Sequence, residues 1–420
     1  MRDLLFLAHR IPYPPNKGDK IRSFHILRHL SSSFKIYLGC FVDDPSEQRY
    51  MAPLREFCAE VFCVPLPPAR KAIRALRAIA LGQSFSEAIY QDAHLRAWVA
   101  NVAVSCNIRD VFVFCSAMSP YVQDSESETR VVTDMVDVDS EKWGTYASFA
   151  VWPVRLLYRL EQRRVHSLEK RAVAACERAL FVSKAEADLF LELMPEAAGL
   201  VGFLENGVDL DVFDPALVFA SPFSVGSSPI VFTGAMNYRP NVDAVQWFAG
   251  EVFPAIRQAC GRAEFWIAGA NPVAGVRRLA KEPGVRVAGA VADVRPYLAN
   301  AHCVVAPMRM ARGVQNKVLE AMAMARPVIL TPAALEGLSA IPGREVLMAS
   351  NPSEFADRVS EALSGLCSEI GFAARKRVER DHSWQQNLKV LDALFEEPAC
   401  RAIAEHAVKR GELRPTGVVP

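Results

Sequence analysis

Short apolar runs alternate along the chain with longer segments in which apolar and polar residues are mixed. Runs such as 4–8 and 36–41 are almost entirely apolar, whereas 18–30 and 154–175 repeat apolar residues at helical spacing. Strands of a parallel sheet that are buried on both faces have continuous apolar sequences, and the helices that connect them are amphipathic. The alternation therefore predicts an α/β protein built on parallel sheets.

The predicted elements form two series separated by a stretch rich in Asp, Pro, Ser and Gly. The first series has strands at 4–8, 36–41, 61–64, 111–115, 131–134, 179–182 and 200–204, and helices at 18–30, 95–104, 154–175 and 184–193. The second has strands at 229–233, 263–268, 285–288, 303–306, 327–330 and 345–348, and helices at 241–253, 293–299, 314–324 and 354–363.

This organisation predicts two doubly wound, Rossmann-like domains that face each other across a cleft. Ligands of such sheets bind at the carboxyl ends of the strands, so the cleft is the expected site. The expected divisions are a first domain over 1–205, a linker over 206–228, a second domain over 229–382, a helix over 383–397 that crosses back to the first domain, and a loosely ordered tail over 398–420.

Composition narrows the function classes. The 420 residues include 48 Lys and Arg against 47 Asp and Glu, a formal charge of +1, whereas a dedicated nucleic-acid binder carries a clear basic excess. The ten cysteines are scattered, without CxxC or zinc spacing, as expected of reduced thiols. No apolar run approaches the ~18 residues of a spanning helix, and the N-terminus lacks the apolar core of a signal peptide. We expect a cytoplasmic protein that binds no nucleic acid and no metal.

The most informative stretch for chemistry is 306–325, where an apolar strand leads through a loop into a strong helix. The start of such a helix offers free N–H groups and a positive dipole end to an anionic phosphate. Lys317 and Glu320 lie three residues apart, on one helical face near that end, where Lys suits a diphosphate and Glu a ribose diol. The alternative is a solvated ion pair on a surface helix. The loop before the helix adds the candidates Arg309, Arg312, Gly313 and Val314.

Loops after other strands carry further candidates. A Pro-stiffened loop after the first strand contains His9, Lys17, Gly18 and Asp19, and the loop after 229–233 contains Gly234, Asn237 and Arg239. Each is either a ligand cradle or an ordinary connection. Asp134, Asp137 and Asp139 follow another strand and suit a general base, sugar ligands or metal ligands, although Asp139 also suits a helix N-cap. P-loop, dinucleotide-fingerprint, GxSxG and HExxH motifs do not occur.

One segment combines basic and apolar residues in a pattern typical of a membrane-surface helix. Within 70–80, Arg70, Lys71, Arg74 and Arg77 alternate with Ile73, Leu76 and Ile79 at helical spacing. Such a helix lies on anionic lipid, or it is a solvated helix packed on its apolar side. We expect a peripheral contact with the inner membrane through 70–80. A second basic stretch runs over 155–171, diluted by two glutamates.

Together these motifs resemble the retaining glycosyltransferases of the GT-B fold, family-four (group 1) type, and in particular those associated with PEP-CTERM/exosortase exopolysaccharide clusters. The segments that carry the resemblance are HRIPYPPNKGDKIRSFHILRHL (9–30), TDMVDVDSEKW (133–143), FVSKAEADLF (181–190), ENGVDLDVF (205–213), FTGAMNYRPNVDAVQWF (232–248) and NKVLEAMAMARPVI (316–329).

The resemblance implies that the second domain binds a nucleotide sugar. Lys317 would then contact the diphosphate and Glu320 the ribose, while the 17–19 loop closes over the donor phosphate and the acceptor. Asn206 and Gly207 would mark the interdomain hinge. The implied reaction is retaining and needs no metal or other cofactor, and the acceptor is a saccharide or lipid-linked saccharide of exopolysaccharide synthesis. His9, Asp134 and Asp137 are the candidates for acceptor binding or for the base.

The sequence departs from the family pattern at one functional position. Members carry a second glutamate eight positions before the one matched by Glu320, and Arg312 stands there in this chain. Phosphate neutralisation would then fall to Lys317 with Arg239, Arg309 or Arg312. Two other functions remain open: a nucleotide-sugar epimerase of the GT-B fold, and a non-catalytic scaffold in polysaccharide assembly.

Overall fold

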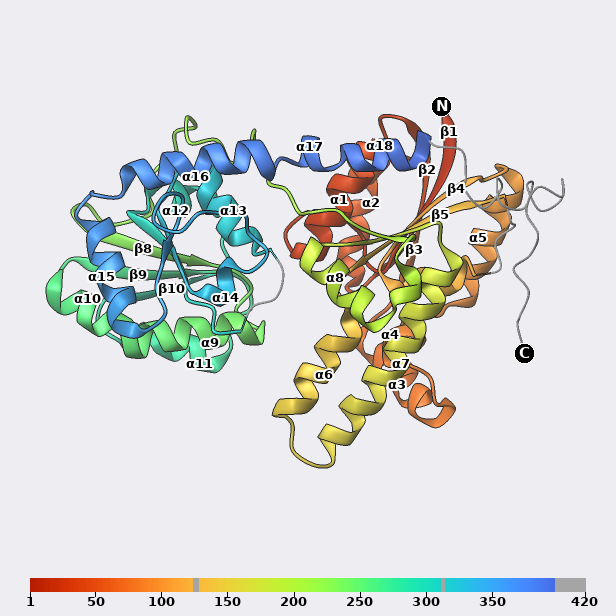
Figure 1. The fold of residues 1–420 in the computed structure, drawn as a ribbon, viewed down its shortest axis with the longest axis horizontal. Helices are drawn as coiled ribbons and strands as arrows, with labels where there is room; N and C mark the ends of the chain where they lie inside the picture. Colours follow the sequence, from red (N-terminus) through yellow and green to blue (C-terminus); the bar gives the residue numbers. More distant parts are fainter. Residues whose placement is uncertain (124–127, 311–313, 397–420) are drawn as a thin grey trace. The chain divides into compact units, whose positions relative to one another are not determined.

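The computed structural model describes residues 1–123, 128–310 and 314–396. The chain divides into two compact units, coloured along the sequence in Figure 1. Unit 1 comprises Met1–Leu204 together with the segment that begins at Leu388, and unit 2 comprises Glu205–Asn387. Each unit is an α/β domain around one parallel sheet, as the apolar pattern predicted.

Unit 1 contains a seven-stranded parallel sheet in the order β3-β2-β1-β4-β5-β6-β7. Every predicted strand of the first series is present. The inner strand β1 pairs with β2 on one side (Leu5 with Tyr37) and with the central strand β4 on the other (Leu5 with Val111). The strands are β1 (Arg2–Ala8), β2 (Phe34–Val42), β3 (Cys58–Pro65), β4 (Asp110–Phe114), β5 (Arg130–Val136), β6 (Arg178–Phe181) and β7 (Val201–Phe203).

Helices cover this sheet, and several of them match the predicted bounds. The unit contains α1 (Gly18–Leu30), η1 (Pro45–Tyr50), α2 (Met51–Leu54), α3 (Pro68–Leu81), α4 (Phe85–Ile89), α5 (Ala93–Ser105), η2 (Ser116–Tyr121), α6 (Asp139–Phe149), α7 (Val154–Ala175), α8 (Lys184–Leu193) and η3 (Pro195–Ala197). Within the described residues, no helix is both long enough and apolar enough to span a membrane.

Unit 2 contains a six-stranded parallel sheet in the order β10-β9-β8-β11-β12-β13. Its strands are β8 (Ser228–Thr233), β9 (Ala263–Ala268), β10 (Val285–Gly289), β11 (Cys303–Ala306), β12 (Val328–Leu330) and β13 (Leu347–Met348). Its helices are α9 (Arg239–Trp247), η4 (Phe248–Val252), α10 (Phe253–Ala259), α11 (Ala274–Arg278), η5 (Leu279–Lys281), α12 (Arg295–Asn300), α13 (Asn316–Ala323), α14 (Pro332–Leu335), α15 (Pro352–Leu363), α16 (Ser368–Asp381) and α17 (Trp384–Asn387).

The chain returns to unit 1 at its carboxyl end through α18 (Lys389–Glu396). The Phe395 carbonyl accepts a hydrogen bond of 2.8 Å from Arg2, the Phe395 ring lies 5.3 Å from that of Phe34, and Asp392 pairs with His29 at 2.7 Å. The segment 206–228, expected as the linker, is placed within unit 2, where the N–H group of Val208 donates to the His382 carbonyl at 2.8 Å.

The sequence pattern did not predict α16, for a reason visible in its packing. Its buried residues are Gly371, Ala374 and Val378, small side chains that give little apolar signal against a charged background. A Cβ atom at Gly371 would lie 2.2 Å from the carbonyl oxygen of Ala325. The helix is therefore held by close backbone approach, which hydrophobic periodicity does not report.

Candidate functional site

The strand order in unit 2 reverses between β8 and β11. From β8 the sheet grows through β9 to β10, and from β11 it grows in the other direction through β12 to β13. The two loops that leave neighbouring strands at such a point diverge and leave room for a ligand. Residues 234–241, and the described residues 307–310 and 314–320, follow these two strands, so the topology places them at one edge of the sheet.

Gly234 makes close packing possible directly after β8. Its φ of +146° lies outside the range that L side chains readily adopt, and an added Cβ atom would lie 2.7 Å from Nδ2 of Asn241 and 3.5 Å from Cε of Lys317. The backbone conformation and the close approach of Asn241 therefore both favour glycine, whereas the distance to Lys317 is that of an ordinary van der Waals contact.

Three side chains surround the ammonium group of Lys317: Asn241, Phe232 and Met308. We call these residues, together with Gly234, the Lys317 corner. The Nζ atom of Lys317 donates a hydrogen bond of 2.5 Å to Oδ1 of Asn241 and lies 4.8 Å from the centre of the Phe232 ring and 3.7 Å from Sδ of Met308. The Asn241 amide is oriented in turn, because its Nδ2 donates to the Ala235 carbonyl at 3.0 Å. The ammonium therefore has a neutral hydrogen-bond partner and a ring face, which leaves its charge available to an anion.

Glu320 lies one turn further along α13, and the two side chains influence each other's charge. Burial lowers the pKa of Lys317 to about 7, and the attraction of Glu320 opposes this shift. Burial likewise raises the pKa of Glu320 to about 7, and Lys317 opposes this shift. Perturbed titratable pairs of this kind occur at functional sites more often than on solvated helix faces. The surroundings of Lys317 and Glu320 thus differ from those of a solvated ion pair on a surface helix, which was the alternative interpretation of the sequence.

The amino end of α13 adds to the positive character of this corner. Its N-cap residue, Gln315, makes no side-chain cap, and the next residue, Asn316, accepts a hydrogen bond of 3.2 Å from Nδ2 of Asn206. The predicted hinge residue Asn206 therefore contacts the start of the helix that carries Lys317. Gly207 lies against α17, since its Cβ atom would be 2.5 Å from the Trp384 nitrogen.

The remaining candidates of unit 2 form no hydrogen bond or ion pair with Lys317 or lie outside the described residues. Asn237 and Arg239 are exposed at the start of α9, and Val314 is buried. Arg309 forms a two-pronged ion pair with Asp243, with Nε 3.0 Å from Oδ2. Arg312 and Gly313 lie outside the described residues.

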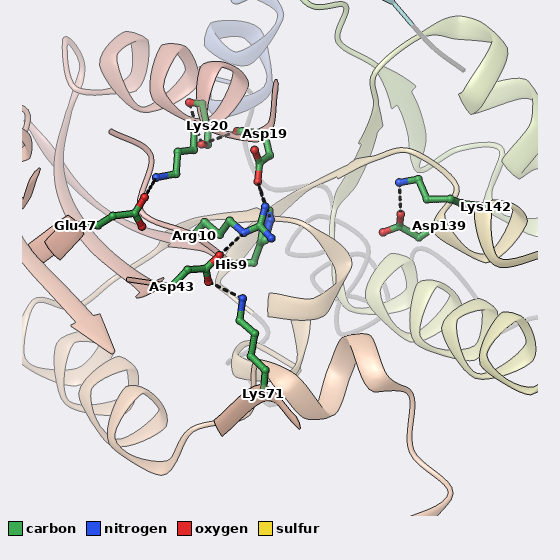
Figure 2. A network of polar contacts seen from close by, with 10 residues as sticks. His9, Arg10, Asp19, Lys20, Asp43, Glu47, Lys71, Asp139 and Lys142 are labelled. Atoms are coloured by element: carbon green, nitrogen blue, oxygen red, sulfur yellow. Dashed lines mark hydrogen bonds and ion pairs between the residues drawn. The ribbon is translucent and has the colours of Figure 1, made fainter. Parts of the chain in front are cut away.

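A second polar network lies at the corresponding edge of unit 1, shown in Figure 2. Nε2 of His9, which follows β1, lies 3.4 Å from Oδ2 of Asp19, and Nη1 of Arg10 donates to the same oxygen at 2.7 Å. Nε of Arg10 lies 3.1 Å from Asp43, which also accepts from Lys71 at 2.8 Å. The network therefore joins the residues after β1 and β2 to the starts of α1 and α3.

Charges in this network determine the protonation of Asp19. Burial raises the pKa of Asp19, but His9 and Arg10 outweigh it and hold the pKa well below its usual range. The His9 ring stacks on Phe114 at 5.7 Å, and its buried Nδ1 has no hydrogen-bond partner among the described residues. Lys17 and Gly18, the other candidates of this loop, are exposed at the start of α1.

The two aspartates proposed as bases differ in their surroundings. Asp134 is fully buried and pairs with the buried guanidinium of Arg22 through contacts of 2.7 and 3.1 Å, an arrangement typical of a structural ion pair. Asp137 is part-exposed; burial raises its pKa above the usual value, and Lys142 at 3.5 Å opposes this. Asp137 therefore has the better surroundings for proton transfer.

Sequence reasoning missed several residues of both networks. Four residues were not singled out as candidates: Asn241, Arg10, Asp43 and Glu47. Glu47 accepts a hydrogen bond from Lys20 at 2.7 Å. An asparagine at the start of a helix and charges in loops are common, and only the fold brings them to the strand ends. Among the described residues, no group of three or more His, Cys, Asp or Glu side chains is placed to hold a metal ion.

Comparison with known proteins supports a family for unit 2. Residues 227–365 match the family model described as "Glycosyl transferases group 1", a range that runs from the start of β8 to the end of α15 and contains the Lys317 corner. The sequence matches none of the curated proteins.

Solved structures show that the chain has the GT-B fold. Sucrose-phosphate synthase from Thermosynechococcus elongatus is 14% identical with a TM-score of 0.66, and the alignment covers 94% of this chain and 98% of that one. HepE from Anabaena, solved with UDP-glucose, is 14% identical with a TM-score of 0.64, covering 94% and 100%. WaaG, a glycosyltransferase involved in lipopolysaccharide biosynthesis, is 14% identical with a TM-score of 0.60, covering 94% and 100%.

Proposed function

We propose that this protein is a glycosyltransferase that transfers a sugar from a nucleotide-sugar donor to a saccharide or lipid-linked saccharide acceptor. The observation that carries the proposal is the Lys317 corner. There an ammonium group on the first turn of α13 lies beside Gly234, which follows β8 at the switch point of the sheet. The match of residues 227–365 to the group 1 transferase model supports this assignment.

The proposed chemistry follows from charge. Cleavage of the bond between the sugar and the diphosphate leaves negative charge on the phosphate oxygens, and positive groups already in position stabilise it. Lys317 and the free N–H groups of the first turn of α13 are assigned this role, and Glu320 accepts from the ribose hydroxyls. The proposed reaction therefore includes no metal ion.

Unit 1 supplies the proposed acceptor site. His9 presents a buried Nδ1 without a partner, and Asp137 has a raised pKa, so both suit a sugar hydroxyl and its proton. We assign acceptor binding to His9 and proton transfer to Asp137. The buried ion pair of Asp134 with Arg22 favours a supporting role for Asp134.

The finer parts of the proposal are retention of the anomeric configuration and a role in exopolysaccharide synthesis. They rest on the resemblance of segments such as 9–30 and 316–329 to retaining enzymes of exopolysaccharide clusters. UDP is the first nucleotide to test, because the similar HepE structure was solved with UDP-glucose.

A thermal-shift panel with UDP, GDP, ADP and CMP tests the donor site. A ligand at about 100 times its Kd stabilises the folded state by about 2.7 kcal/mol, a readily measured shift. We expect one nucleotide to stabilise the wild type and Lys281→Ala, an exposed lysine of the same unit, but not Lys317→Ala. No shift with any of them would contradict the donor site.

Product analysis separates the alternative functions. With donor and a saccharide acceptor, a transferase releases the nucleoside diphosphate only when acceptor is present, and the anomeric coupling in the product NMR spectrum reports retention. An epimerase converts the donor into an isomeric nucleotide sugar without acceptor. A scaffold gives no turnover in the wild type, and Glu320→Gln then changes nothing.

A further inference from the structure

Helices α6 and α7 form a hairpin in unit 1 that extends away from the sheet, at the bottom of Figure 1. Its base is anchored to the chain that follows α3. Ser84 donates to Glu161 at 2.9 Å, and Arg164 donates to the Gln83 carbonyl at 3.0 Å. The part of α7 before Glu161 extends about 10 Å beyond this anchor at 1.5 Å per residue.

The end of the hairpin exposes large apolar side chains. Trp152 is 81% exposed, Val151 78% and Phe149 64%, and Leu156 at the start of α7 is 54% exposed. Clustered exposed apolar residues of this size mark a surface that contacts a partner or a membrane. We call residues 149–156 the hairpin tip.

Other side chains, not those of the tip, hold the two helices together. Trp143 of α6 packs against Tyr158 of α7 with ring centres 5.5 Å apart, and Gln162 donates to Glu141 at 3.1 Å. The N–H group of Ser140 donates to the buried Glu169 at 3.0 Å. Since these contacts lie between the tip and the sheet, the tip residues are free of a role in the packing of the hairpin.

The charge near the tip has one sign. From Lys142 to Leu160 the sequence contains no Asp or Glu, and Arg155 and Arg159 are both exposed. The next acid, Glu161, is buried and accepts from Ser84 and from the Ser86 N–H group. An apolar tip with tryptophan, bordered by arginines, is complementary to an anionic membrane surface.

The sequence predicted membrane contact for the segment 70–80. Most of its charged side chains form ion pairs or hydrogen bonds within the protein. Lys71 pairs with Asp43 at 2.8 Å, Arg74 with Asp92 at 2.7 Å, and Arg70 donates to the Pro65 carbonyl at 3.0 Å. The apolar side chains of α3, such as Leu76, are exposed. Arg77 is exposed, so membrane contact through 70–80 stays a prediction, and the α6–α7 hairpin offers a second surface with two exposed arginines.

We propose that the hairpin tip, residues 149–156, inserts into the headgroup region of a bilayer that contains anionic lipid. Trp152, Val151 and Phe149 enter the interface between headgroups and acyl chains, while Arg155 and Arg159 bind lipid phosphates. The contact can be tested independently of the proposed sugar transfer, because vesicles without donor or acceptor suffice to measure it.

Vesicle co-sedimentation of the full chain tests the proposal, with vesicles of phosphatidylcholine alone and with phosphatidylglycerol added. We expect at least tenfold stronger retention of the wild type on the anionic vesicles. Phe149→Ser/Trp152→Ser and, separately, Arg155→Glu/Arg159→Glu should each lose at least tenfold of this retention. Leu366→Ser/Phe372→Ser removes equally exposed apolar side chains from unit 2 and should behave like the wild type.

Three results would overturn the proposal: no retention of the wild type, equal retention on neutral vesicles, or full retention of both tip variants. A wild type that self-associates in solution and becomes monomeric in Phe149→Ser/Trp152→Ser, without binding vesicles, would identify a second copy as the partner. Circular dichroism melting and the nucleotide thermal shift confirm that each variant is folded, and they separate loss of lipid contact from failure of the proposed donor site.

Discussion

The Nζ atom of Lys317 lies 2.5 Å from Oδ1 of Asn241, a residue 76 positions earlier in the chain. The two side chains come from the helices that follow β8 and β11, the strands between which the sheet order reverses. The contact therefore joins the starts of the two helices that follow the strands at the switch point. A neutral amide holds the ammonium in place there without neutralising its charge.

Replacing Asn241 by aspartate should weaken nucleotide binding. Asn241→Asp places a carboxylate beside the Lys317 ammonium, and this internal ion pair competes with the diphosphate. We expect the Kd for the nucleoside diphosphate to rise at least tenfold, about 1.4 kcal/mol. Calorimetric titration measures it. Gln246→Glu makes the same charge change at an exposed position of α9 and should leave the Kd near that of the wild type.

Nucleotide binding should depend on pH through Lys317. Burial lowers the pKa of this group to about 7, so the free protein loses the ammonium as the pH rises above 7. Because the diphosphate binds the charged form, affinity should fall between pH 7 and pH 9, by up to about tenfold per pH unit, with proton uptake on binding. Below pH 7 the ammonium is already formed, and this dependence ends.

Titration calorimetry in HEPES and in Tris, buffers with different ionisation enthalpies and no phosphate to compete for the site, measures that proton uptake. Lys317→Arg keeps a charge at every pH in this range, so the part of the fall in affinity that comes from loss of the ammonium should disappear. Equal apparent enthalpies of the wild type in both buffers at pH 8 would contradict the assignment of Lys317 to the diphosphate.

A methyl group at Gly234 should damage both stability and binding. Gly234→Ala places a Cβ atom 2.7 Å from Nδ2 of Asn241 at a φ of +146°, so we expect a loss of about 1–3 kcal/mol in the free energy of unfolding and weaker nucleotide binding. Gly226→Ala is the matched control, since its φ is +81° but no atom lies within 4 Å of the added Cβ. It should cost about 1 kcal/mol and leave binding intact. Urea unfolding and nucleotide titration compare the two variants.

Asp134 provides a test between a structural and a catalytic role. Asp134→Ala leaves the buried Arg22 guanidinium without its carboxylate, which should destabilise the protein by about 3–5 kcal/mol. The double variant Arg22→Met/Asp134→Leu removes both charges and should recover much of this loss. If Asp134 is the catalytic base instead, Asp134→Asn retains wild-type stability in urea but loses transfer activity.

The positions of most strands could be predicted because a strand buried on both faces is apolar at every residue. Runs such as 303–306 and 4–8 therefore lie in β11 and β1. Prediction failed for α16, whose buried face consists of small residues, and for the division of 241–253 into α9, η4 and α10. The hydrophobic period reports how much apolar area is buried, and it does not report how closely two backbones approach.

The candidate site was predictable only where it is local. Lys317 and Glu320 share a helical face by their spacing alone, so the sequence determined that a charged pair follows a buried strand. Only the tertiary structure decided which partners these side chains have. Asn241 accepts a hydrogen bond from Lys317, Arg22 forms a buried ion pair with Asp134 across 112 positions, and Asp43 pairs with Lys71. Local spacing determines which face of a helix a side chain occupies, whereas its partner, burial and pKa depend on contacts between distant segments that form only when the sheet assembles.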